Sequence, residues 1–172
     1  MPAIQEITES LIRDHIQHAV AEVFGTMLRS PVTLNEVPKA LPPPTPMTPA
    51  GNAPWVVGTV GFVGDINGLI YLYFSEDFAT NCTEKMLGMS AAEVAEGGNE
   101  VVNDAVGELT NMVVGSFKNR LCDAGLPCKL TVPSILRGQN FRIEGTGTAR
   151  RYAYVFDCSG RRMVADILMN AD

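Results

Sequence analysis

Apolar side chains recur three or four positions apart in two long stretches of this chain, a spacing that is typical of amphipathic helices. One stretch covers residues 4–28 and the other covers residues 99–121. A shorter helix is predicted over residues 76–88, because acidic residues favour its start and Gly88 stands where a left-handed cap belongs.

Strand patterns fill much of the remaining chain. Residues 55–75 hold two runs of β-branched and aromatic residues around a turn at 64–68, which predicts a hairpin with a loop of about four or five residues. A short strand is expected at 32–37. A further strand is expected at 129–138, where Pro133 marks a sheet edge or a bulge.

The C-terminal part of the chain predicts two more strands, joined by a hairpin turn at 158–161. Before that turn Tyr152, Tyr154 and Phe156 alternate with other residues, as expected for a half-buried strand. Strands that follow one another through hairpins indicate a largely antiparallel sheet.

The order of these elements predicts an α+β fold, a largely antiparallel sheet with two long helices packed on one face. The 172 residues are enough for one domain with a sizeable core, so we expect a single domain over 1–172. The proline-rich segment 38–54 is incompatible with a helix or a central strand, and we expect a surface loop there.

Composition and charge narrow the class of function. The formal net charge is −6 and no Lys/Arg cluster stands out, which argues against nucleic-acid binding. No stretch approaches the roughly 20 apolar residues needed to span a bilayer, and the start of the sequence lacks the pattern of a secretory signal. We therefore expect a cytoplasmic protein with no membrane or nucleic-acid partner.

The cysteines and histidines do not have the spacing of a metal site. Cys82, Cys122, Cys128 and Cys158 form no C-x-x-C pair, and in the cytoplasm we expect them to be reduced, partly buried thiols. His15 and His18 lie three residues apart, and partly exposed helix histidines are the better interpretation. No metal site is predicted.

The helix over residues 99–121 has an unusual polar side. At about 100° per residue, one sector is apolar, and the opposite sector is expected to hold Glu100, Asn103, Asp104, Gly107, Glu108, Asn111, Gly115 and Lys118. Each glycine inside a helix costs roughly 1 kcal/mol relative to alanine. With Val114 placed near the same sector, the pattern predicts a docking face to which Gly107, Val114 and Gly115 contribute.

Two polar side chains on that face have useful chemistry. Glu108 and Asn111 are three residues apart and therefore neighbours on the helix surface, with Asp104 one turn earlier. A carboxylate pairs with a lysine, and a carboxamide both donates and accepts hydrogen bonds, so it can orient a water molecule. The alternative is an ordinary solvated helix face. Any catalysis would need groups supplied by a partner.

These residues resemble the pattern of the CheC/CheX/FliY chemotaxis phosphatases: Asp104-x3-Glu108-x2-Asn111, followed by Pro133. The stretch "DAVGELTNMVVGSFKNRL" is most similar to the CheX type, and the likeness extends to the N-terminal helix and the hairpin "GFVGDINGLIYLYFS". The resemblance implies a phosphatase of phosphorylated CheY-like response regulators, part of two-component chemotaxis signalling.

The resemblance also implies roles for the residues. Asn111 would orient the attacking water, Glu108 would pair with the regulator's active-site lysine, and Asp104 would support the pair. The protein would carry no cofactor, since Mg²⁺ would belong to the regulator. A single Glu-x-x-Asn copy favours the CheX type, which implies a homodimer.

Two other functions remain open. One is a non-catalytic adaptor of the same fold that binds a receiver domain through the same helix. The other is a small-molecule-binding domain that uses apolar space under the proline-rich loop 38–54.

Overall fold

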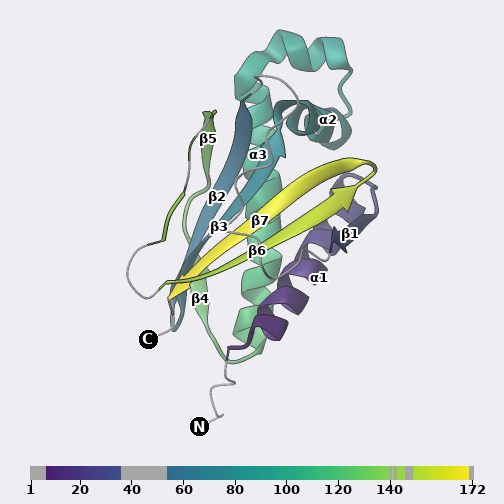
Figure 1. Cartoon of the computed structure of the whole chain (residues 1–172). Helices are drawn as coiled ribbons and strands as arrows, with labels where there is room; N and C mark the ends of the chain where they lie inside the picture. The colour runs from purple at the N-terminus through teal and green to yellow at the C-terminus, as the bar shows by residue number, and fades with distance from the viewer. Residues whose placement is uncertain (1–6, 36–53, 140, 142, 146–148, 171–172) are drawn as a thin grey trace.

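The computed structural model (Figure 1) describes residues 7–35, 54–139, 141, 143–145 and 149–170. All of the proline-rich segment except Pro54 lies outside the described residues, so the expected surface loop there stays a prediction. The same holds for the predicted helical residues 4–6.

A seven-stranded sheet forms one layer of the molecule, with the strand order β1-β6-β7-β3-β2-β4 and with β5 also paired to β2. Every pairing is antiparallel, which confirms the sequence-based expectation. The strands are β1 (Val32–Asn35), β2 (Trp55–Gly64), β3 (Asn67–Ser75), β4 (Cys128–Leu130), β5 (Ser134–Gly138), β6 (Arg150–Cys158) and β7 (Arg161–Asn170).

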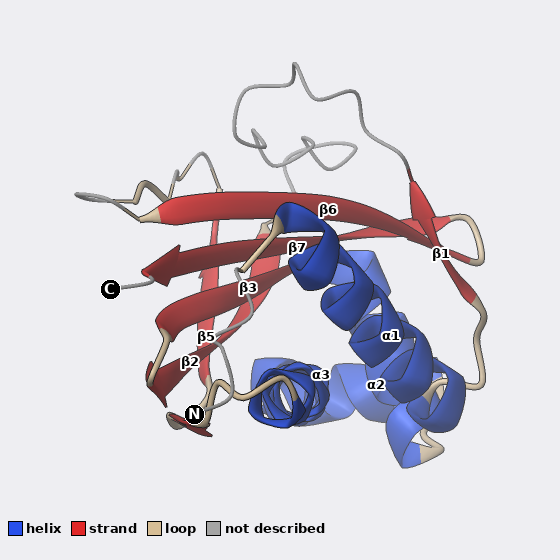
Figure 2. Cartoon of the chain, turned by 90° about the horizontal axis from the view of Figure 1, so that it is seen from below, coloured by secondary structure: helices blue, strands red, loops and turns tan. Residues whose placement is uncertain are grey.

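The helices cover one face of this sheet (Figure 2). They are α1 (Glu9–Met27), α2 (Glu76–Leu87) and α3 (Ala91–Asp123). The main core fills the space between the two layers, and its largest fully buried side chains include Phe24, Phe62, Phe74, Phe78 and Phe117. The α+β fold with two long helices on one face is therefore confirmed.

Helix ends follow local capping rules. Thr8 caps α1 by accepting a hydrogen bond from the Leu11 amide, so the helix begins later than its apolar pattern suggested. Ser75 caps α2, and Gly88 closes it in the left-handed conformation, with φ of 63°, as predicted.

The long helix α3 begins at Ala91, earlier than expected, and kinks at Gly98. Gly98 has φ of 68° and ψ of −161°, a backbone conformation that is essentially restricted to glycine. The kink separates a short first segment from the part that follows residue 98. That second part corresponds to the stretch 99–121.

The two hairpins differ in how well they were predicted. The β6–β7 turn is as expected, with Ser159 and Gly160 at φ of 51° and 81°. The β2–β3 connection is tighter than expected. Pairing continues to Phe62 opposite Gly68, and the Gly64 amide donates to Oδ1 of Asn67. Only Asp65 and Ile66 stand between the strands, so the prediction of a longer loop was wrong.

A bulge separates β4 from β5 at the edge of the sheet. Leu130 pairs with Phe62, and Ser134 pairs with Thr59. Two residues of β2 therefore lie opposite three residues, 131–133, which is the definition of a β-bulge. The bulge contains Pro133, which cannot donate a backbone hydrogen bond, as the sequence indicated.

The other face of the sheet carries a smaller apolar cluster. Trp55, Val57, Tyr73 and Val164 are buried there, and Phe141 stacks on Tyr73 with ring centroids 6.3 Å apart. The segment after β5 therefore crosses this face and covers part of it.

Candidate functional site

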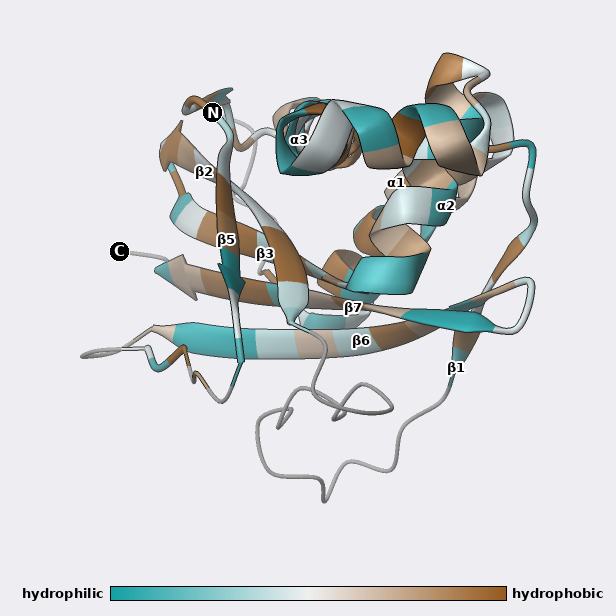
Figure 3. Cartoon of the chain, turned by 90° about the horizontal axis from the view of Figure 1, so that it is seen from above, coloured by the Kyte–Doolittle hydropathy of each residue, from teal (hydrophilic) through white to brown (hydrophobic). Residues whose placement is uncertain are grey.

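The outward side of α3 carries the residues that the sequence singled out. Asp104 and Glu108 are exposed, and Asn111 is half-buried one turn after Glu108. Figure 3 shows α3 as a helix of mixed hydropathy lying over the sheet. Because the three side chains recur every three or four residues, they form one ridge along the helix.

The polar groups of this ridge have no bonding partner in the part of the chain that the structure describes. Within the residues that the structure describes, the side chains of Asp104, Glu108 and Asn111 form no hydrogen bond or ion pair. A solvent-facing carboxylate and a neighbouring carboxamide are thus available to an incoming partner. Their shared helix fixes the spacing between them.

The expected positions of Gly107 and Val114 were wrong. Both residues are buried, and Val114 is fully inaccessible to solvent. A Cβ added to Gly107 would lie 3.9 Å from Cδ1 of Ile135, so this residue faces β5. Both residues therefore lie on the buried side of α3 and not on the exposed ridge.

Gly115 is half-buried at the border of the ridge. A Cβ at this position would lie 3.8 Å from Cδ1 of Leu130 in β4. That is an ordinary van der Waals distance, so the fold itself does not require glycine there. A contribution of Gly115 to docking stays a prediction.

A close contact between α3 and β2 sets the distance between the helix that carries the ridge and the sheet. A Cβ on Gly58 would overlap the Thr110 hydroxyl and come within 2.9 Å of the Thr110 Cβ. Thr110 is fully buried and donates its hydroxyl to the carbonyl oxygen of Val106, 2.7 Å away. Helix α3 therefore contacts the backbone of β2 at Thr110, the residue before Asn111.

The contact at Gly58 was not predicted from the sequence, because this residue lies inside a predicted strand and was not singled out. The available evidence was the run of glycines inside a predicted strand, where glycine marks the close approach of another backbone. The helix that makes this approach is distant in the sequence.

Helix α1 packs against the C-terminal half of α3. Ser116 donates its hydroxyl to Oε2 of Glu22 across the α1–α3 contact, 3.0 Å away. His15 packs edge-on against Phe117, and its Nε2 is buried without a hydrogen-bond partner within the described residues. Burial lowers the pKa of His15, and the nearby Arg120 lowers it further.

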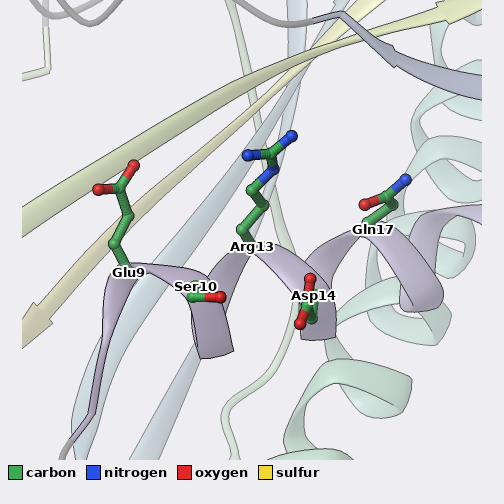
Figure 4. Close-up of a pocket in the computed structure, with 5 residues that line it drawn as sticks. All are labelled: Glu9, Ser10, Arg13, Asp14 and Gln17. Carbon is green, nitrogen blue, oxygen red and sulfur yellow. The ribbon is translucent and has the colours of Figure 1, made fainter.

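One surface hollow lies on α1 and not on the ridge. A hollow of about 280 Å³ lies along the first turns of α1, lined by Glu9, Ser10, Arg13, Asp14 and Gln17 (Figure 4). All five of these lining residues come from one helix. Neither Glu108 nor Asn111 lines it.

No group of three or more potential metal-ligating side chains occurs among the described residues. No helix in the described part of the chain is long and apolar enough to cross a membrane. The ridge offers two carboxylates, Asp104 and Glu108, and the carboxamide of Asn111, and none of these three residues is a hydroxyl or thiol nucleophile.

Comparison with known proteins connects this arrangement to a family. The family model described as chemotaxis phosphatase CheX matches residues 56–157. The CheY-P phosphatase CheX of Thermotoga maritima is 27% identical over 92 residues, which cover 54% of this chain and 57% of that protein. The match thus spans little more than half the length of this relative.

Solved structures share the fold along nearly the whole chain. A crystal structure of chemotaxis protein CheX from Vibrio vulnificus has a TM-score of 0.74 at 22% identity, and covers 96% of this chain and 100% of that one. A CheX–CheY–BeF3–Mg²⁺ complex from Borrelia burgdorferi has a TM-score of 0.64 at 18% identity, with 92% and 97% covered.

Proposed function

The chain belongs to the CheX family of chemotaxis phosphatases, and we propose that it accelerates the hydrolysis of the phosphoaspartate of a CheY-like response regulator. Water attacks the phosphorus atom in this reaction, and the products are the free aspartate carboxylate and inorganic phosphate. The observation that carries the proposal is the pair of free functional groups, Glu108 and Asn111, on one exposed ridge.

Asn111 is the catalytic residue of this proposal. Its carboxamide enters the regulator's active site and holds the attacking water in line with the phosphorus–oxygen bond that breaks. The carbonyl oxygen of the amide accepts a hydrogen bond from the water, so a lone pair of the water faces phosphorus. Positioning of this kind can supply several kcal/mol of rate acceleration.

Glu108 fixes the register of the complex. Its exposed carboxylate pairs with a lysine of the regulator's active site, and the shared helix then places Asn111 at the phosphoryl group. Asp104, also exposed and one turn earlier, adds negative charge to the same side and supports the approach of a basic surface.

The metal ion of the reaction belongs to the regulator in this proposal. The CheX–CheY structure from Borrelia burgdorferi includes BeF3 and Mg²⁺ along with the two proteins. When bound, Mg²⁺ neutralises charge on the phosphoryl oxygens. The present chain contributes the water-orienting amide and the pairing carboxylate.

The test is a phosphate-release assay with purified response regulators of the host. We expect one regulator to lose phosphate faster with the wild-type protein, and Asn111→Ala to lower that acceleration at least about 100-fold, as for the loss of one transition-state hydrogen bond. The matched control is Asn119→Ala, an exposed asparagine two turns along α3. Unchanged rates with the Asn111 variant would contradict the proposal.

A non-catalytic adaptor is the second candidate, because the same exposed ridge would also serve binding alone. Tight binding of a phosphorylated receiver without faster loss of phosphate would favour it. The third hypothesis, a small-molecule site under the segment 38–54, concerns residues outside the described part of the chain and stays open.

We also propose that the protein acts as a homodimer in the cytoplasm. The proposal rests on the CheX type of the sequence pattern, and light scattering of the purified chain at several concentrations tests the dimer.

A further inference from the structure

The bulge at residues 131–133 exposes an apolar side chain beside α3. Val132 is 84% exposed, more than any other large hydrophobic residue in the described part of the chain. Isolated apolar residues on a surface are common. Val132 differs from such isolated residues because its bulge lies level with Asn111 and is fixed by hydrogen bonds to β2.

Contacts between α3 and the edge strands place the bulge level with Asn111. The α3 position of Gly107 faces Ile135 in β5, and the α3 position of Gly115 faces Leu130 in β4. The helix therefore runs antiparallel to this edge. Asn111 stands midway between the two glycines, and the bulge stands midway between Leu130 and Ile135.

Hydrogen bonds and a proline hold the bulge in place. The Thr131 amide donates to the Gly61 carbonyl oxygen, and the Gly61 amide donates to Oγ1 of Thr131, both at 2.8 Å. On the other side of Val132, the ring of Pro133 fixes its own backbone φ. Bulges often redirect a side chain next to an active site, and here the redirected residue is an exposed valine.

We propose that Val132 is a docking contact for the response regulator and that it sets the affinity of the complex. This inference rests on the proposed function. The surface that the partner must offer is specific: a basic group for Glu108, and an apolar recess beside it for the isopropyl group of Val132.

The size of protein interfaces supports a response regulator as the occupant. A stable interface covers roughly 800 Å² on each partner, a patch on the order of 30 Å across. A partner centred on Glu108 and Asn111 therefore covers the bulge as well. An exposed apolar side chain that such a partner covers loses its contact with water, and the apolar area buried in this way favours binding.

The experiment measures kcat and KM for phosphate release, and the affinity for the regulator carrying a beryllofluoride phosphoryl mimic. Val132→Asp and Val132→Ala are compared with Val63→Asp, an exposed valine on β2. Its neighbour Phe62 lies in the core on the helix side of the sheet, so Val63 points to the other face. We expect Val132→Asp to raise KM and the dissociation constant at least tenfold with kcat within a factor of two. Val132→Ala should have a smaller effect, Val132→Ile should retain wild-type affinity, and Val63→Asp should change neither.

The outcomes separate this inference from the proposed function. If the wild-type protein accelerates phosphate loss but the Val132 variants keep the KM of Val63→Asp, the docking role of Val132 is wrong and the phosphatase proposal stands. A loss confined to kcat, or a change only in the self-association of the chain, would also overturn the docking role. If no regulator responds to the wild-type protein, the phosphatase proposal itself fails, whereas Val132-dependent binding would still support docking.

Discussion

At the scale of single residues, Asn111 and Gly107 show how differently two neighbouring positions of one helix behave. The sequence placed both on the polar sector of α3. Asn111 is half-buried with a free carboxamide, whereas Gly107 is buried against β5. The helical-wheel angle separates them by only about 40°, and the border between the exposed and buried sectors falls within that interval.

Gly107 therefore provides a prediction about stability. A methyl group at this position meets Cδ1 of Ile135 at 3.9 Å, an ordinary contact distance. We expect Gly107→Ala to raise the free energy of unfolding by about 0.5–1 kcal/mol, because alanine reduces the entropy of the unfolded chain. Urea denaturation measures it. Gly25→Ala on α1, where a Cβ meets open space, is the matched control and should give a gain of the same size.

A lower stability of Gly107→Ala would show that α3 and β5 are packed more tightly than these distances indicate. Phosphatase activity should stay near the wild-type level, because the added methyl group points to the sheet and away from the ridge.

At the scale of elements, the contact of α3 with β2 sets the position of the ridge. Gly58→Ala would drive a methyl group into the Thr110 side chain, which is fully buried and has no free direction in which to move. We expect a destabilisation of about 1–3 kcal/mol, as for other overpacked cores, and a lower kcat because the helix that carries Asn111 is displaced. Denaturation and phosphate-release assays measure the two effects.

The double variant Gly58→Ala/Thr110→Ala removes the clashing hydroxyl and should recover part of both losses. The recovery is partial because the two Cβ atoms would still be about 2.9 Å apart. Wild-type stability and activity in the single variant would mean that α3 adjusts to the extra methyl group without moving the ridge.

Elements were predicted well where a local pattern determines them. The β6–β7 turn, the Gly88 cap and the Pro133 interruption all depend on residues close in sequence, and each is where the sequence placed it. The kink at Gly98 was not predicted, because the predicted helix began at residue 99 and the helical segment before it was not recognised. Val114 was placed incorrectly because its burial in the main core depends on tertiary packing, which a helical wheel does not include.

At the scale of the whole molecule, a buried ion pair ties the second face of the sheet together. Asp166 of β7 is fully buried and accepts two hydrogen bonds from the guanidinium of Arg151 in β6. The same guanidinium donates to the carbonyl oxygen of Ile143, 2.9 Å away. One arginine thus joins two strands to the segment that covers the second apolar cluster.

Arg151→Met should destabilise the protein by about 3–5 kcal/mol, because it leaves the Asp166 carboxylate buried without its partner. Chemical denaturation at neutral pH measures the change. Arg161→Met, which breaks the exposed ion pair of Arg161 with Asp77, is the control and should cost no more than about 1 kcal/mol. Equal effects of the two substitutions would contradict the structural role of Arg151.

The overall architecture was predicted correctly because hairpins and helices alternate in an order that permits few arrangements. The site was predicted only as a set of residues. The ridge could be predicted from the spacing of its residues along one helix. The contact between Gly58 and Thr110 beneath it joins residues about fifty positions apart, so no local pattern predicts it.

The four cysteines differ in their accessibility to thiol reagents. All are free, and Cys82, Cys128 and Cys158 are buried, whereas Cys122 is half-buried near the end of α3. Burial raises the pKa of Cys82 to about 12 and that of Cys128 to about 11, and it also raises the pKa of Cys158. Since thiolates are the reactive form, a maleimide dye meets Cys122 first. The native chain can thus be labelled with one fluorophore at Cys122, on the helix that carries Glu108 and Asn111. Binding of a regulator to that helix is then measured as a change in fluorescence emission.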